Sequence, residues 1–350
     1  MKVISVNAST QYQVYVDHGI LSSAGAYLTS LVSPGKAAII SDSNVFPLYG
    51  EELQRSLSNA GFQVIHHVIP AGEESKNGTT YLAILNFLAE NAVTRSDVVI
   101  ALGGGVTGDI TGFAAATFLR GIAYVQIPTS LLAMVDSSVG GKTAIDLPAG
   151  KNLAGAFYQP RLVLCDLNVL STLPQEIFCD GCAEVIKYGV LFDSPLFEHL
   201  MEKGIHFSRE EVISRCIELK RDVVMEDEFD QGKRQLLNLG HTIGHGIEAQ
   251  SNFSISHGKA VAIGMAIVAK SAAKSGVCSE STYTDICKIL EKFSLPSSTV
   301  FSAEALYKSA LSDKKRSGQT VNLIVPEKIG QCIIQKTSTA DVKSFIEAGL

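Results

Sequence analysis

The first half of this chain alternates short apolar runs with a helical pattern, and this alternation restricts its fold most strongly. The runs are rich in β-branched residues and bounded by turn residues, as buried strands are. Strand, helix and strand in repetition predict a parallel-type sheet with helices on both faces. The strand candidates are KAAIISD (36–42), QVIHHVI (63–69), SDVVIALGGG (96–105), IAYVQIP (122–128) and RLVLCDL (161–167), and TTYLAILNFLAENA (79–92) is the helix.

After about residue 174 the pattern changes to long amphipathic segments, which predict helices. A chain of 350 residues exceeds what one hydrophobic core usually supports, so we expect two domains. The predicted fold is an α/β domain over residues 1–174, followed by a mostly α-helical domain over 175–350. The predicted helical segments are 176–203, 208–226, 234–249, 258–275 and 281–293, and a short hairpin is predicted at 320–335.

Composition excludes several classes of function. The net charge is −6 without a long block of like charges, which argues against a nucleic-acid surface. The most apolar stretch, AVAIGMAIVA (260–269), is far shorter than the ~18 residues of a membrane span. The N-terminus alternates like two short strands and does not resemble a signal peptide. Seven cysteines form no disulfide framework and suggest the cytoplasm, with Cys179 and Cys182 interpreted as incidental thiols.

The glycine-rich stretch LGGGVTGD (102–109) follows a predicted strand and precedes a helix. Gly103, Gly105 and Gly108 match GxGxxG, in which backbone N–H groups meet a pyrophosphate. No acidic residue closes a second strand about twenty residues later, as the usual dinucleotide fingerprint requires. We therefore favour a nucleotide phosphate site of another kind, with a purely structural glycine turn as the alternative.

Three further segments bring cations to small, apolar surroundings. In IPTSLLAMVDSSVGGKTAID (127–146) and GKNLAGAFYQP (150–160), Lys142 and Lys151 each follow glycine. Glycine allows the backbone to approach a ligand, and lysine neutralises phosphate.

In GCAEVIKYG (181–189), Glu184 and Lys187 share a helix face. A surface ion pair is one interpretation, but apolar neighbours indicate a buried carboxylate, which needs a partner or a metal ion.

Three of the eight histidines, His241, His245 and His257, lie between residues 241 and 257. The i,i+4 spacing of the first two in NLGHTIGH places both on one helix face, as in known zinc sites. A catalytic zinc ion takes three protein ligands from His, Glu or Cys. With Glu184 available, the spacing indicates a metal site but leaves open which histidine is not a ligand.

Taken together, these segments resemble the 3-dehydroquinate synthase family. The resemblance implies conversion of 3-deoxy-D-arabino-heptulosonate 7-phosphate to 3-dehydroquinate and phosphate, with transient oxidation by NAD and a Zn²⁺ or Co²⁺ ion. It also implies a cytoplasmic homodimer in which Arg120 reaches the partner subunit's site. It extends over nearly the whole chain, through SDSNV (41–45), PAGEESK (70–76), GGGVTGDITGFAAATFLRG (103–121), CAEVIKYG (182–189), RQLLNLGHTIGHGIE (234–248), SHGKAVAIGM (256–265) and SDKK (312–315).

The resemblance also assigns roles to individual residues. It implies that Glu184, His241 and His257 hold the metal, so that His245 belongs to the substrate and proton-transfer groups. The implied NAD residues are Asp42, Glu73, Lys76, Gly104, Gly105, Val106, Asp109, Thr129, Ser130, Asp136, Lys142, Lys151, Val169, Thr172 and Leu173. The implied substrate residues are Lys142, Asn152, Lys187, Lys220, Arg234, Asn238, His245 and either Lys314 or Lys315.

The sequence departs from the family pattern at two of these segments. Ser130 replaces the second threonine of PTT but keeps a hydroxyl, and Asp146 stands where asparagine is common. The nearest alternatives are a 2-deoxy-scyllo-inosose synthase-like cyclase and a glycerol-dehydrogenase-like oxidoreductase. Lys220, Arg234 and Asn238 favour a substrate with a carboxylate over the first. An inactive binding protein on the same fold is a further alternative, which the complete set of site residues disfavours.

Overall fold

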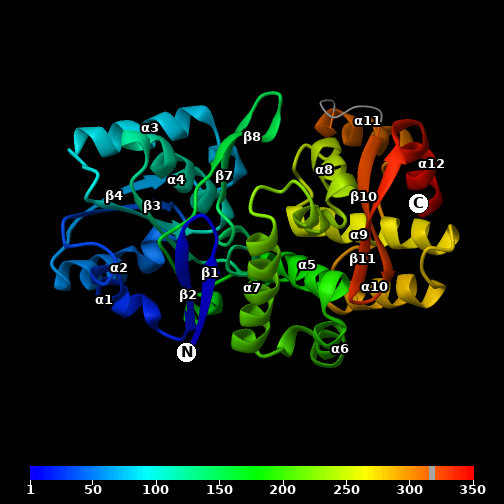
Figure 1. The fold of residues 1–350 in the computed structure, drawn as a ribbon, viewed down its shortest axis with the longest axis horizontal. Coiled ribbons are helices and arrows are strands. Elements are labelled where there is room, and N and C mark those ends of the chain that lie inside the picture. The colour runs from blue at the N-terminus through cyan, green and yellow to red at the C-terminus, as the bar shows by residue number, and fades with distance from the viewer. Residues whose placement is uncertain (315–319) are drawn as a thin grey trace. The chain divides into compact units, whose positions relative to one another are not determined.

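The structure is a computed structural model that describes residues 1–314 and 320–350, with side chains described outside 310–319. The chain forms two compact units (Figure 1). Unit 1 comprises Met1–Leu173 and Arg209–Phe229, and unit 2 comprises Pro174–Ser208 and Asp230–Leu350. The predicted α/β domain and the mostly helical domain are both confirmed as fold classes.

Unit 1 contains a seven-stranded sheet in the order β1-β2-β9-β6-β5-β3-β4. Strands β1 and β2 pair antiparallel, whereas the other neighbours pair parallel. The sheet is therefore of the predicted parallel type with an antiparallel edge. Its strands are β1 (Lys2–Asn7), β2 (Gln11–Asp17), β3 (Lys36–Asp42), β4 (Gln63–Ile69), β5 (Val98–Gly103), β6 (Ala123–Pro128) and β9 (Leu162–Asp166).

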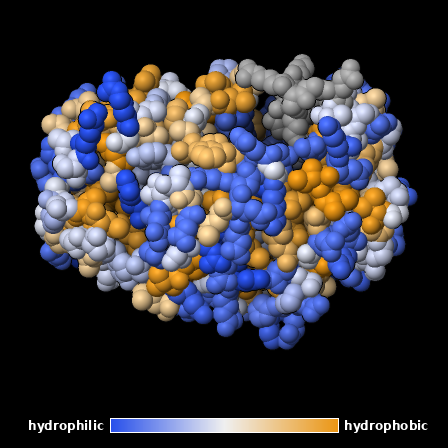
Figure 2. Space-filling model, in the orientation of Figure 1, coloured by the Kyte–Doolittle hydropathy of each residue, from blue (hydrophilic) through white to orange (hydrophobic). Residues whose placement is uncertain are grey.

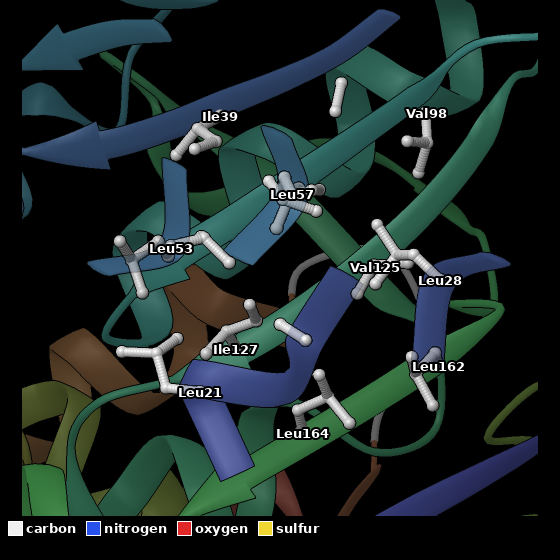
Figure 3. Packing of buried hydrophobic residues seen from close by; sticks show 14 of the residues in the cluster. Leu21, Leu28, Ile39, Leu53, Leu57, Val98, Val125, Ile127, Leu162 and Leu164 are labelled. Atoms are coloured by element: carbon white, nitrogen blue, oxygen red, sulfur yellow. The ribbon is translucent and has the colours of Figure 1, made fainter. Parts of the chain in front are cut away.

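Helices cover both faces of this sheet, which is why its central strands read as continuous apolar runs. Ile39 of β3 packs with α1 (Ala24–Thr29) and α2 (Phe46–Asn59) on one face (Figure 3). Its neighbours on the strand, Ala38 and Ile40, point to the other face, where α3 (Gly78–Glu90) and α4 (Gly105–Thr117) pack.

Unit 1 also contains a hairpin that the sequence did not predict and a helix that the predicted boundary at residue 174 assigns to the second domain. A hairpin of β7 (Lys142–Leu147) and β8 (Gly150–Phe157) follows β6. Helix α7 (Arg209–Glu226) packs on β1, β2 and the short η4 (Ala133–Ser137). The division at residue 174 had placed α7 in the second domain, because an amphipathic pattern indicates a helix without indicating what it packs against.

Unit 2 is mostly helical and has one two-stranded sheet, β10 (Thr320–Lys328) with β11 (Gln331–Ser338). One predicted segment, 176–203, is two helices, since Asp193 caps the second and Pro195 lies in its first turn. The helices are α5 (Gln175–Phe192), α6 (Ser194–Lys203), α8 (His241–Gln250), α9 (His257–Lys274), α10 (Glu280–Lys292), α11 (Ala303–Lys314) and α12 (Thr339–Gly349).

Short helical turns connect the larger elements. They are η1 (Ile20–Ser23), η2 (Glu73–Ser75), η3 (Phe118–Arg120), η5 (Leu167–Ser171), η6 (Gly204–His206) and η7 (Lys233–Asn238).

Over the face seen in Figure 2, hydrophilic and hydrophobic residues are interspersed. Within the described ranges, no helix has both the length and the apolar character needed to cross a bilayer.

Candidate active site

In unit 1, the glycine-rich stretch connects the end of β5 to α4. The helix begins at Gly105, and Gly104 before it is extended. The backbone N–H groups of the first turn of α4, which includes Val106, therefore lie at the carboxyl end of a central parallel strand. A helix N-terminus at this edge of an open sheet is a favourable place for a phosphate group.

Asp42 lies at the end of the neighbouring strand β3 and is tied to the same helix. Its carboxylate accepts a hydrogen bond from the Thr107 hydroxyl at 3.2 Å and from the backbone N–H groups of Asn44 and Val45. The adjacent turn Val169–Thr172 contacts α2, because the Tyr49 hydroxyl bonds to the Val169 carbonyl at 3.1 Å and to the Thr172 hydroxyl. The structure thus places Asp42, which is predicted near the adenosine ribose, and the predicted NAD residues Val169 and Thr172 at the carboxyl edge of one sheet.

Lys76 is the centre of a buried polar cluster in unit 1. Its ammonium group lies 2.6 Å from a carboxylate oxygen of Asp109 and 2.6 Å from the side-chain oxygen of Asn152. Burial acts to lower the pKa of Lys76, but Asp109 and Glu73 outweigh it and raise the pKa. Lys76 therefore stays charged. Nearby, Lys151 pairs with Glu73 at 3.5 Å.

Helix α7 adds Lys220 to these predicted residues. The Lys220 ammonium donates to the Asp136 carbonyl at 2.5 Å and lies 3.0 Å from the Asp136 carboxylate. Thr129 donates its backbone N–H to Gly103, and Ser130 accepts from the Ala133 N–H at 3.3 Å. The Ser130 hydroxyl thus stabilises a turn beside the glycine stretch, as a threonine hydroxyl would.

Unit 2 contains the predicted metal-binding group. Glu184 of α5, His241 of α8 and His257 of α9 place their ligand atoms within 4.8 Å of one another. The Nε2 atoms of His241 and His257 lie 3.5 and 3.6 Å from the same oxygen of Glu184. One carboxylate and two imidazoles in such proximity are a donor set for a catalytic zinc ion, so these residues fit the implied metal.

Close helix packing sets the positions of the two histidines. Each is the first residue of its helix, and Gly240 before His241 has a φ of +78°, which favours glycine. A Cβ on Gly264 of α9 would lie 2.1 Å from the Gly240 carbonyl oxygen. On α5, Asp180 accepts from the Lys259 N–H at 2.9 Å and from the Ser256 hydroxyl, which fixes the start of α9.

Protonation differs between the two histidines. Burial, reinforced by Lys187, lowers the pKa of His241 to about 3, so this ring is neutral. Burial also acts to lower the pKa of His257, but hydrogen bonds to Glu184 and Glu248 outweigh it and raise the pKa to about 10. His257 is therefore the predicted ligand that would have to lose a proton for a metal ion to bind.

The predicted anion-binding residues of unit 2 are deeply buried. Lys187 pairs with Glu184, each being 1% exposed, so the surface alternative for this pair is wrong. Arg234 of η7 is also 1% exposed, and Asn238 ends the same turn. His245 lies beside the metal-binding group, with its ring centroid 5.5 Å from that of His241.

Sequence reasoning missed Glu248. It is 3% exposed, and its carboxylate lies 3.4 Å from Nδ1 of His257. His245, Glu248 and His257 also have ligand atoms within 4.8 Å of one another. The signal was present, since positions 241, 245 and 248 follow the i, i+4, i+7 spacing of one helix face.

The remaining predicted residues differ in their surroundings. Lys142 is the exposed first residue of β7. Arg120 is exposed and lies between Leu119 and Gly121 in three successive residues with positive φ. Leu173 donates its backbone N–H to Leu170. Lys314 ends α11 but its side chain lies outside the described part, as does Lys315 altogether.

The sequence matches known proteins over most of its length. Residues 66–180 match the family model of the 3-dehydroquinate synthase N-terminal region, and residues 181–316 match that of the C-terminal region. A 3-dehydroquinate synthase from Clostridium acetobutylicum is 42% identical, with 99% of each chain covered. One from Pelobacter propionicus is 45% identical over 95% of this chain and 96% of its own.

Solved structures are similar over the full length. A 2-deoxy-scyllo-inosose synthase complexed with carbaglucose-6-phosphate, NAD⁺ and Co²⁺ has a TM-score of 0.89 at 25% identity, with all of both chains covered. A 2-epi-5-epi-valiolone synthase from Streptomyces hygroscopicus, with NAD⁺ and Zn²⁺ bound, has a TM-score of 0.89 at 27% identity and covers 99% of this chain and 97% of its own.

Proposed function

This chain belongs to the 3-dehydroquinate synthase family, and from that membership we propose that the residues described above carry out the family's reaction. The enzyme converts 3-deoxy-D-arabino-heptulosonate 7-phosphate to 3-dehydroquinate and phosphate. The observation that carries the residue assignment is the group of Glu184, His241 and His257, with Lys187 buried against its carboxylate.

The cofactor is NAD, which when bound would supply a reversible hydride acceptor and would not be consumed. In our proposal, the N–H groups of the first turn of α4 bind its pyrophosphate and Asp42 accepts hydrogen bonds from its adenosine ribose. The charged Lys76 and the pair of Lys151 with Glu73 belong to the same site. Their support is that they gather at the carboxyl edge of the parallel sheet, where such ligands bind.

Glu184, His241 and His257 would hold Zn²⁺ or Co²⁺, which acts as a Lewis acid on substrate hydroxyl groups when bound. The low pKa of His241 keeps its ring nitrogen available as a ligand. Glu248 accepts the hydrogen bond from Nδ1 of His257, and this leaves Nε2 to face Glu184. An outer carboxylate of this kind orients a ligating histidine.

The substrate carries a carboxylate and a phosphate, so its binding requires several cations in this acidic protein. In unit 2, Lys187 and Arg234 supply buried charge, and a guanidinium binds such groups in bidentate fashion. Asn238 ends the turn that carries Arg234. In unit 1, Lys142, Lys220 and Asn152 are the proposed substrate groups.

Proton movement is assigned to His245 and to the substrate itself. A neutral imidazole has one nitrogen that donates and one that accepts a proton, and the His245 ring lies 5.5 Å from that of His241 and 6.3 Å from that of His257. Oxidation at C5 acidifies the C6 proton, and the departing phosphate of the substrate can take that proton. This accounts for a site in which no protein carboxylate is assigned as the base.

We further propose a cytoplasmic homodimer in which Arg120 reaches the partner subunit's site. The support is that three successive left-handed residues hold an exposed arginine, a costly conformation for leucine and arginine. Mixing R120A with the metal-site variant H241A tests this. Recovered activity in the mixture supports a contribution across subunits, and no recovery contradicts it.

The reaction is tested by phosphate release from the heptulosonate phosphate with trace NAD, before and after chelation and Zn²⁺ restoration. We expect metal-dependent release of one phosphate per dehydroquinate, without net NADH. Activity only on glucose 6-phosphate would instead identify an inosose synthase. Accumulation of NADH with a simple polyol would identify a dehydrogenase.

A further inference from the structure

A closed set of hydrogen bonds holds Asn152 in place near the start of β8. The Asp146 carboxylate accepts from the Asn152 backbone N–H at 2.8 Å, and the Asp146 N–H donates to the Lys76 carbonyl at 2.8 Å. The Lys76 ammonium donates to the Asn152 side-chain oxygen at 2.6 Å. Three residues from two segments of unit 1 thus form a ring of hydrogen bonds.

This ring fixes which atoms Asn152 offers to a ligand. An ammonium group only donates, so the amide oxygen must face Lys76 and the amide NH₂ must face away from it. Asn152 is exposed, and among the described residues its NH₂ group has no acceptor. Asn152 is therefore held as a hydrogen-bond donor.

Asp146 supports the backbone conformation of Asn152. The φ of Asn152 is +54°, in the left-handed region, where asparagine is found more often than most residues other than glycine. The carboxylate of Asp146 satisfies the N–H of Asn152 in this conformation, as an Asx-type acceptor does in turns. Lys76 is held separately by Asp109 at 2.6 Å. Removing the Asp146 side chain would take away the acceptor of the Asn152 backbone N–H while leaving Lys76 paired with Asp109.

We propose that Asp146 is a positioning residue that keeps Asn152 aimed as a donor at an acceptor oxygen of the substrate, such as one of its carboxylate or phosphate oxygens. This inference rests on the proposed function, in which Asn152 contacts the substrate. It assigns a task to the aspartate that stands where the family commonly has asparagine. Either side chain has an oxygen that can accept the Asn152 N–H.

The experiment compares D146A, D146N and N152D with the wild type in KM for the heptulosonate phosphate and in Kd for NAD. In D146A, the hydrogen bond from Asn152 to a charged oxygen of the substrate should be lost, which should raise KM about tenfold. The affinity for NAD should change less than about threefold. D146N keeps an acceptor and should stay within about twofold of the wild type. N152D keeps the oxygen toward Lys76 but loses the donor, and should lose most substrate affinity.

The matched control is D97A. Asp97 also accepts backbone N–H groups within unit 1, from Lys36 and Thr94 at 2.7 Å each, and it has no assigned part in binding. D97A should lower Tm without changing KM. If D146A behaves like D97A, or if D146N does not restore KM, the positioning role is wrong. An equal loss of NAD affinity would also overturn it, whereas a wild type inactive on this substrate would overturn the proposed function as well.

Discussion

The Nδ1 atom of His257 lies 3.4 Å from Oε2 of Glu248, whereas Nε2, the nitrogen proposed to bind the metal, faces Glu184. Glu248 therefore determines that Nδ1 keeps its proton when His257 loses one to bind a metal ion. We expect E248Q to lower the apparent Zn²⁺ affinity by about 10- to 100-fold, because the outer hydrogen bond orients the ligand. Competition with a chromogenic chelator measures it, with the exposed E280Q as control. An unchanged affinity would contradict the role of Glu248.

Metal uptake should release a proton. The pKa of His257 in the metal-free protein is raised to about 10, above its ordinary 6.5, so the ring is charged at pH 8 and must deprotonate to bind. Apparent affinity should thus rise with pH until about pH 10. Calorimetry in buffers of different ionisation enthalpy counts the protons, and no release at pH 8 would show that His257 is already neutral.

The same shift predicts the pH dependence of metal-free stability. A raised folded-state pKa stabilises the folded protein fully below about pH 6.5, and that contribution is lost as pH rises through about 10. Denaturant unfolding of the metal-free protein at pH 6, 8 and 10 should show a falling free energy of unfolding. H257Q should show a smaller pH dependence over the same interval.

Replacing Lys187 should make the thermal stability of the protein more dependent on a bound metal ion. K187M leaves Glu184 buried without its lysine, which costs about 3–5 kcal/mol for a pair of this kind. A bound divalent cation compensates the carboxylate, so Zn²⁺ should raise the Tm of K187M more than that of the wild type. An equal Zn²⁺ effect on both proteins would mean that Glu184 is not a ligand.

The contact of α8 with α9 should tolerate no added methyl group. The Cβ of G264A would lie 2.1 Å from the Gly240 carbonyl, one residue before His241. We expect a loss of about 1–3 kcal/mol in the free energy of unfolding and weaker Zn²⁺ binding. G78A is the control, since nothing lies within 4 Å of its added Cβ. Normal metal affinity in G264A would show that the helices separate without moving His241.

The strands and the long helices could be predicted from the sequence because their apolar spacing is local. KAAIISD (36–42) was predicted as a strand, and β3 spans the same residues, Lys36–Asp42. The predicted helix at 258–275 corresponds to α9, His257–Lys274. Such patterns record which face of an element is buried, and they do not record the partner. This is why the amphipathic pattern of residues 208–226 predicts α7 but not its packing within unit 1.

The metal-binding group shows the same limit. Spacing alone made His241 and His245 equivalent, because both lie on one face of α8. Only tertiary packing brings Glu184 of α5 to His241 and His257. From the sequence, this set of three residues was indicated by the resemblance to the family and not by spacing. The left-handed Asn152 and its link to Lys76 were not predictable either, since the hydrogen bonds join residues 76 positions apart.

The path of the chain has a consequence for dissecting the protein. It passes from one unit to the other three times, after Leu173, Ser208 and Phe229. A fragment that stops at residue 173 would lack α7, and with it the lysine that neutralises Asp136. The shortest continuous segment that contains all of unit 1 ends at residue 229 and must also carry residues 174–208. Neither unit can therefore be expressed alone, or fused to another protein, as one uninterrupted segment of this chain.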